Sequence, residues 1–271
     1  MGAALVVTDI PTRAPLVGKV ARLRLLGAMR VIRTDGSEAF ASDFRTAKTR
    51  QLLRLLALQD GDPVRVGTLI DLLWPTVPER RGRASLRTAA CQLRSTLRAN
   101  HVVRVGDTLQ LRDVEVDVTR FQHEAVRAHR ALTAGDQRTG LARAHLALRL
   151  YAGPLAEDEP WLDPILEAQA QLAMQRRELQ LAAGSAALEL DRPHDAIGLV
   201  ASVLDDDGSC ERACRLLMLA YGQLAERSMA LRVYERFRRT LAEELGVSPS
   251  ADTTAVYLDL LNDVDLPGRT A

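Results

Sequence analysis

The chain has 271 residues, of which 47% are hydrophobic, 26% are charged and only 4% are aromatic, and its formal net charge is +1. This is the composition of a globular protein with room for one large domain or two ordinary ones. No stretch approaches the roughly 20 apolar residues of a membrane span. No basic segment precedes the apolar run at 5–7, so we expect no signal peptide and no membrane partner. Three cysteines are too few for a disulfide scaffold, which favours a cytoplasmic location.

The charge is divided unevenly along the chain. Residues 1–120 carry a net charge of +8, and residues 121–271 carry a net charge of −7. A basic half followed by an acidic half suggests a nucleic-acid-binding domain joined to a domain with a different role. The excess of arginine, 34 against 2 lysines, is also what GC-rich codons produce, so we give the choice of arginine itself no weight.

The first elements are a flexible arm, a small sheet and a helix. Residues 1–20 show no hydrophobic period, which predicts the arm. Apolar residues then alternate around an Asp35-Gly36 turn, which predicts an antiparallel sheet over about 21–42. From Thr46 the leucine spacing is helical until Asp60-Gly61.

Two further helices are expected before residue 100. A short extended piece at 64–66 precedes a helix that carries the apolar residues of 69–74 and ends before Pro75. The next helix is expected from about 80 to 99. Its apolar stripe, which we expect to be buried, consists of Leu86, Ala90, Leu93 and Leu97.

This third helix is strongly basic, with six arginines and no acidic residue between 80 and 98. The arginines that flank the apolar stripe are Arg83, Arg87, Arg94 and Arg98. The residues opposite the stripe are Thr88, Cys91 and Ser95. A solvated helix face is the alternative explanation of such a run, but the unbalanced sign of the charge favours an anionic partner.

A β-hairpin is expected directly after this helix. Residues 102–105 and 109–112 alternate on either side of the turn pair Gly106-Asp107. Three helices, the third basic, followed by a hairpin, form the pattern of a winged helix-turn-helix. In that arrangement the third helix enters the major groove, and the hairpin reaches the DNA backbone or the minor groove.

Four strings of the sequence, taken in order, match the motifs of one known family. They are Lys48-Thr49-Arg50-Gln51-Leu52-Leu53, residues 69–74, residues 84–88 with Leu93-Arg94 and Leu97, and residues 116–121. In this order they resemble the opening of the first helix, the second helix, the recognition helix and the crossing into the activation domain of the SARP family of actinobacterial antibiotic regulators. The resemblance implies an OmpR-type winged helix-turn-helix over 21–113.

The chain departs from that family at three positions. Gly106-Asp107-Thr108 lacks the aromatic residue that the family's wing usually carries. Ala89 stands where a larger residue is common, and Gly67 stands where a polar helix cap is usual. These departures concern contacts of the wing and the preference for bases rather than the fold.

The acidic half shows only helical patterning, so we expect an all-α domain similar to tetratricopeptide repeats. Ala196 and Ala230 are 34 residues apart, which is the period of that repeat. In this register Leu217, Tyr221 and Tyr234 also fall on repeat positions.

The same half resembles the bacterial transcriptional activation domain of SARP regulators. The stretches that carry this resemblance are Leu148 to Leu155 with Tyr151 and Gly153, Trp161, and the ending 241–250 (Leu-Ala-Glu-Glu-Leu-Gly-Val-Ser-Pro-Ser). We place this domain at 114–265 and a tail at 266–271. The fold class is therefore mainly α with small β-sheets.

The sequence lacks three common motifs of catalytic and metal sites. Gly18-Lys19 lacks the spacing of a P-loop, no Gly-x-Ser-x-Gly occurs, and the five histidines have no metal-ligand spacing. We expect no enzyme, no cofactor and no metal. We also expect the small type of SARP regulator, without the ATPase domain of longer relatives and without a receiver domain.

The sequence therefore predicts a DNA-binding transcriptional activator. The candidates for base contact are Arg87, Thr88, Cys91, Arg94 and Ser95. The candidates for backbone contact are Lys48, Arg50, Arg83, Arg98, Arg104 and Arg112. The family resemblance implies direct repeats near the promoter −35 region, a homodimer on DNA, RNA polymerase with its σ factor as partner, and a secondary-metabolite gene cluster as target. The alternatives are a protein-interaction adaptor and a small-molecule sensor.

Overall fold

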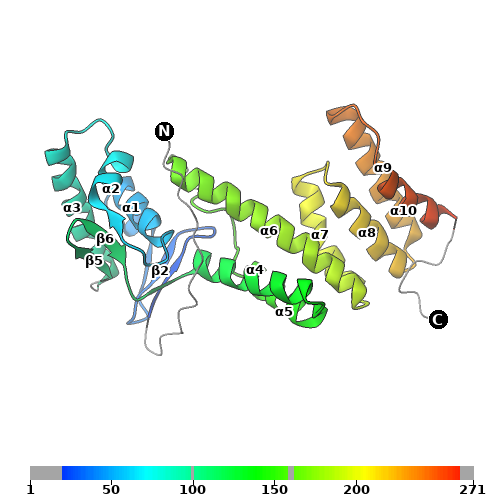
Figure 1. Cartoon of the computed structure of the whole chain (residues 1–271), viewed down its shortest axis with the longest axis horizontal. Coiled ribbons are helices and arrows are strands. Elements are labelled where there is room, and N and C mark those ends of the chain that lie inside the picture. The colour runs from blue at the N-terminus through cyan, green and yellow to red at the C-terminus, as the bar shows by residue number, and fades with distance from the viewer. Residues whose placement is uncertain (1–19, 99–100, 158–161, 263–271) are drawn as a thin grey trace.

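The structure is a computed structural model, and it describes residues 20–98, 101–157 and 162–262. The predicted tail at 266–271 and Trp161 lie outside these residues, as does the predicted arm except for Val20. Figure 1 shows the three-helix unit with its hairpin at one end of the molecule and the last helical pairs at the other end.

A four-stranded sheet opens the described chain. Strands β1 (Ala21–Arg24), β2 (Arg30–Ile32) and β3 (Glu38–Phe40) are antiparallel neighbours, which confirms the predicted sheet. A fourth strand, β7 (Val114–Val116), pairs parallel with β1, and the order is β3-β2-β1-β7. The domain boundary expected between 113 and 114 thus falls just before a strand of the N-terminal sheet. Ala21 and Leu23 are buried and Arg22 and Arg24 are exposed, as in a sheet with one solvated face.

Three helices follow where the sequence predicts them. After the short 3-10 turn η1 (Ala41–Asp43), they are α1 (Ala47–Ala57), α2 (Val66–Leu73) and α3 (Glu79–Leu97). Thr46 caps α1, because its hydroxyl oxygen accepts from the backbone N–H of Thr49 at 3.2 Å. Gly67 lies inside α2 rather than at its cap, which is Arg65.

The predicted hairpin is confirmed and belongs to a second, three-stranded sheet. Strands β5 (Val102–Val105) and β6 (Thr108–Leu111) are antiparallel, and β6 also pairs with β4 (Val64–Arg65). The backbone N–H of Val66 donates to the carbonyl of Asp107 at 2.9 Å. The tip of the hairpin is therefore tied to the start of α2.

Helix α3 packs tightly against α2 at Gly82. A Cβ atom added there would lie 2.5 Å from Cγ2 of Ile70, whereas a Cβ added to Gly67 would meet nothing within 4 Å. We expect Gly82→Val to lower the free energy of unfolding by about 1–3 kcal/mol, because overpacking forces neighbours out of place. Gly67→Val is the matched control, and should change stability by less than about 1 kcal/mol. Urea unfolding of both variants measures this, and equal losses would contradict the close packing at Gly82.

The second half consists of helices that pack against their neighbours in chain order. They are α4 (Asp117–Thr133), α5 (Gln137–Leu148), α6 (Asp163–Glu189), α7 (Pro193–Asp206), α8 (Glu211–Gln223), α9 (Arg227–Glu244) and α10 (Ala251–Leu261). Apart from an isolated bridge between Leu26 and Leu155, the described residues after β7 form helices and their connections. Within the described part of the chain, we find no helix that could cross a membrane.

The 34-residue spacing corresponds to packing between these helices. Ala196 in α7 and Ala230 in α9 are both at most 1% exposed. Helix α7 packs on α6, and α9 packs on α8. Tyr234 is also buried and stacks on Tyr257 of α10 with 4.0 Å between ring centroids. Cys210 and Cys214 are buried, as expected of small apolar residues, and burial raises the pKa of the Cys214 thiol to about 12.

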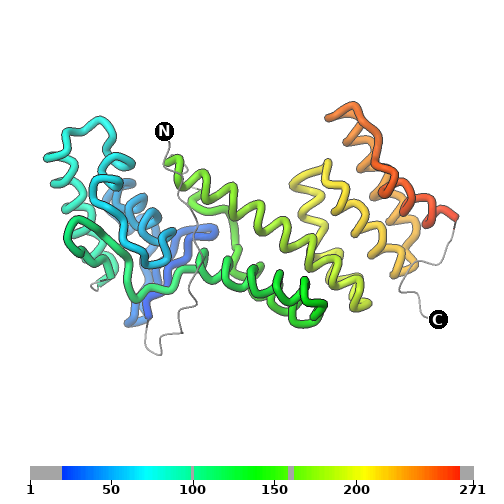
Figure 2. Tube along the Cα trace, in the orientation of Figure 1, coloured from blue at the N-terminus to red at the C-terminus, as the bar shows by residue number. Residues whose placement is uncertain are grey.

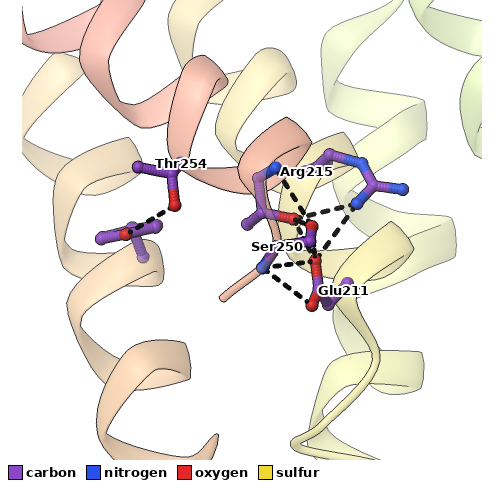
Figure 3. A network of polar contacts seen from close by, with 6 residues as sticks. Glu211, Arg215, Ser250 and Thr254 are labelled. Carbon is purple, nitrogen blue, oxygen red and sulfur yellow. Dashed lines mark hydrogen bonds and ion pairs between the residues drawn. The ribbon is translucent and has the colours of Figure 1, made fainter. Parts of the chain in front are cut away.

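The ending 241–250 leads into α10 and fixes this helix on α8 (Figure 3). The Glu211 carboxylate at the start of α8 accepts from the Ser250 backbone N–H at 3.1 Å and from the hydroxyls of Ser250 and Thr253. Arg215 Nη1 donates to Thr253 Oγ1 at 2.9 Å. Ser250 also caps α10, since its hydroxyl oxygen accepts from the Thr253 N–H. One carboxylate at the start of α8 thus anchors the start of α10.

The two halves are joined by hydrogen bonds as well as by the chain that connects them. Figure 2 shows the chain passing from the hairpin through β7 directly into α4. The buried Asp117 carboxylate accepts from the backbone N–H groups of Leu25 at 2.9 Å and Leu26 at 3.0 Å. Burial raises the pKa of Asp117, and these N–H groups oppose that effect. The N–H of Gly27 donates to the Pro154 carbonyl at 3.1 Å, which ties the N-terminal sheet to the loop after α5.

Candidate DNA interface

Helix α3 is seated on the core by the stripe that the sequence predicts. Leu86, Ala90, Leu93 and Leu97 are each no more than 3% exposed. Ala89 is also buried, which widens the buried face by one position. The opposite face of the helix is left to solvent, and Figure 1 shows α3 at the far end of the molecule from the helical half.

Three hydrogen bonds hold α3 along its length. Thr49 of α1 donates its hydroxyl to the Gln92 side chain at 2.7 Å. The Arg33 guanidinium donates through Nε to the Thr96 carbonyl at 2.7 Å. Arg94 donates through Nε to the Val102 carbonyl of β5 at 2.9 Å. The first two bonds fix the helix to α1 and to the four-stranded sheet, and the third fixes it to the hairpin.

Four of the five base-contact candidates lie together on the outward face of α3. They are Arg87, Thr88, Cys91 and Ser95, and all four are exposed. The Thr88 hydroxyl donates to the Ala84 carbonyl at 3.1 Å. The Thr88 proton is therefore used within the helix. We call the surface formed by these four residues the α3 outer face; Arg87 lies nearest the start of the helix.

Arg94, the fifth candidate, is placed differently. Its side chain is half-buried, and its Nε is engaged by the carbonyl of Val102. Only its terminal N–H groups are left to reach outward. The helical period places Arg94 beside the apolar stripe, but it cannot reveal an acceptor in the hairpin.

The backbone-contact candidates lie on or next to α1, α3 and the hairpin, and they differ in how far their side chains are engaged in other contacts. Lys48 is half-buried at the start of α1, and Arg50 donates through Nη1 to the Ala41 carbonyl at 3.2 Å. Arg98 lies at the end of α3 with its Nη1 3.6 Å from the Asp35 carboxylate. Arg112 is exposed and lies beside the buried Gln110. With the Gln110 amide oriented so that its oxygen faces Arg112, this oxygen accepts from Arg112 Nε at 2.6 Å.

Arg83 and Arg104 converge on a carboxylate at the tip of the hairpin. Arg83 Nη1 donates to Asp107 Oδ1 at 2.8 Å, and Arg104 Nη2 lies 3.7 Å from the same atom. Arg83 Nε also donates to Glu79 at 2.9 Å. The hydrogen bond from Arg83 lowers the pKa of Asp107, and the same bond raises the pKa of Arg83. These ion pairs join the first turn of α3 to the hairpin.

Sequence reasoning gave no role to three exposed residues of this surface. Arg80 and Arg81 lie in the first turn of α3, and Val105 is 54% exposed beside the hairpin turn. Both arginines belong to the basic run, and the spacing of seven residues places them on the same side of the helix as Arg87 and Thr88. Alternation along β5 places Val105 on the face opposite the buried Val102, but the sequence does not show which of the two faces is exposed.

Residues 116–261 match the family described as the bacterial transcriptional activator domain. The chain is 31% identical over 217 residues to the regulatory protein DnrI of Streptomyces peucetius, which covers 75% of this chain and 80% of DnrI. It is 30% identical over 257 residues to the regulatory protein AfsR of Streptomyces griseus, which covers 91% of this chain. This chain spans about a quarter of the length of AfsR, since the match covers 25% of that protein.

A solved structure has a similar fold over both halves of the chain. It is that of Mycobacterium tuberculosis EmbR in complex with a low-affinity phosphopeptide, with a TM-score of 0.75 and 23% identity over 92% of this chain and 67% of that one. The likeness in fold supports the winged helix-turn-helix expected for α1–α3 and the hairpin. These relatives are transcriptional regulators. This chain belongs to the SARP family.

Proposed function

We propose that this protein is a sequence-specific DNA-binding transcriptional activator of an antibiotic or other secondary-metabolite gene cluster. The observation that carries the proposal is the α3 outer face, a row of exposed residues on a helix whose other face is anchored at three points. This helix is joined to an activator domain of known family. A reading helix held rigidly in this way can be aligned with base edges in the major groove.

Each residue of the outer face has a chemistry suited to base edges. The Arg87 guanidinium can bind O6 and N7 of a guanine with two hydrogen bonds. The Thr88 methyl group can contact a thymine methyl group, because the Thr88 hydroxyl is already turned back to the helix. Cys91 and Ser95 are small, so they allow the helix backbone to approach the groove floor. We assign Arg94 first to holding the hairpin and only second to a base contact.

The surrounding cations are suited to phosphate. Lys48, Arg50 and Arg98 lie at the ends of α1 and α3, and Arg83, Arg104 and Arg112 lie at or beside the hairpin. Cations on both sides of a reading helix contact the two strands that border the major groove. Such contacts set affinity and register without reading sequence.

We further propose that two copies bind direct repeats near the −35 region and contact RNA polymerase with its σ factor. The family membership supports this, as does the arrangement along the chain, because the activator domain extends away from α3 (Figure 1). A homodimer on DNA and a cytoplasmic location follow from the same proposal.

Gel shifts with promoter fragments of the neighbouring gene cluster test the proposal. One fragment should bind at nanomolar concentration and at least about 1,000-fold more tightly than shuffled DNA of equal length. Purified RNA polymerase should then transcribe that promoter more strongly when the protein is present. Equal affinity for every fragment would contradict the proposal and would favour a protein-interaction adaptor or a small-molecule sensor.

A further inference from the structure

A carboxylate occupies the cationic surface where DNA phosphates are expected. Asp107 Oδ1 accepts from Arg83 at 2.8 Å and lies 3.7 Å from Arg104, and both arginines are proposed phosphate contacts. The side chains of Asp107, Arg83 and Arg104 are 59%, 40% and 47% exposed. The pairing is therefore made at the surface, in the space open to an approaching duplex.

The position of this carboxylate is fixed by the backbone around it. The Asp107 carbonyl accepts from the N–H of Val66 at 2.9 Å, at the start of α2. The neighbouring Gly106 carbonyl accepts from Arg104 Nε at 3.1 Å. The turn that carries Asp107 is thus tied both to the helix-turn-helix unit and to the arginine beside it.

Phosphate and carboxylate oxygens compete for the same guanidinium N–H groups. Both are anions that accept charge-assisted hydrogen bonds from arginine, and Arg83 cannot give one N–H to both at full strength. If a phosphate displaces Asp107 from Arg83, the carboxylate is left beside an ion of like charge. Both effects reduce the binding free energy that each phosphate contact of Arg83 or Arg104 contributes.

We propose that Asp107 is an internal competitor for phosphate that limits the sequence-independent binding of DNA by this protein. The inference rests on the proposed function, because it requires that the surface of α3 and the hairpin binds DNA. Binding to random DNA consists almost wholly of phosphate contacts, so it should be the most sensitive to this competition.

The test is the affinity of the full chain for a random duplex over a series of salt concentrations. Asp107→Asn should raise that affinity about three- to tenfold at moderate salt, and should steepen the dependence of log K on log salt by about one unit, because one more phosphate contact releases counterions. Asp113→Asn is the matched control. It removes the same charge from an exposed position beyond the far end of β6, and should have a smaller effect.

A second variant separates competition from general charge. With Arg83 and Arg104 both replaced by Ala, Asp107→Asn should raise the affinity for random DNA no more than Asp113→Asn does. The Asp107 carboxylate then has no arginine for which it can compete with phosphate. A loss of affinity in Asp107→Asn, or a gain equal to that of Asp113→Asn, would overturn the inference while leaving operator binding intact. Failure of the wild-type chain to bind any DNA would instead overturn the proposed function, and this inference with it.

Discussion

Inserting about five base pairs between the two repeats of the operator should abolish joint occupancy by two copies of this protein. Half a helical turn moves the second repeat to the opposite face of the duplex, whereas recognition helices one turn apart, about 10–11 base pairs, meet the major groove from the same side. In this chain α3 lies at one end of an elongated molecule, so a half-turn rotation carries the whole helical half of the second copy away from the first (Figure 1).

A gel-shift series over spacer lengths measures this effect. Inserting a full turn restores the face but separates the copies, so it should recover joint binding only in part. The control is an operator with one repeat inverted, which should also bind two copies poorly. Equal affinity for the inverted and direct arrangements would contradict head-to-tail binding, and would favour a two-fold symmetric dimer of the kind that binds palindromes.

Arg87→Ala should weaken operator binding by about 1–3 kcal/mol, or about 5- to 150-fold, and should barely change affinity for random DNA. The reason is that a guanidinium bound to a base contributes only where the correct base is present. Arg87 is exposed in the middle of α3, away from the bonds that hold this helix, so its loss should leave the fold intact.

Arg104→Ala is the comparison variant for Arg87→Ala. It should weaken binding to operator and random DNA alike, and should reduce the salt slope by about one unit, as expected for a phosphate contact. Thermal unfolding shows whether either variant has lost stability. If Arg87→Ala changed both affinities by the same factor, Arg87 would be a backbone contact and the reading residues would lie elsewhere.

Much of the N-terminal half could be predicted because its signals are local. The stripe from Leu86 to Leu97 follows from the helical period, and the hairpin follows from alternation around Gly106-Asp107. Strand β7 was not predicted, because three residues without a turn signal are too few to show a period. Its partner β1 lies about 90 residues away, and only the fold brings the two strands together.

The engagement of individual arginines could not be predicted for the same reason. Arg94 bonds to a carbonyl of β5 and Arg33 bonds to a carbonyl of α3, and neither acceptor has a sequence signature. Asp107 was recognised as a turn residue and as a departure from the family's wing. Its contact with Arg83, 24 positions earlier, depends on how the hairpin folds back on α3. Periodicity therefore finds the surface, whereas the tertiary contacts decide which cations on it are already engaged.

Alkylation of Cys91 tests most directly whether the α3 outer face reads DNA. Cys91 is exposed in the middle of that face, whereas Cys210 and Cys214 are buried and serve as internal controls that label only on unfolding. We predict that a thiol reagent labels Cys91 in the free protein, and that saturating operator duplex slows this labelling at least about tenfold, because a helix seated in the major groove leaves no room for the reagent. Shuffled duplex at a salt concentration that prevents its binding should give no protection. Unchanged labelling of Cys91 while a gel shift shows the operator fully bound would contradict the account.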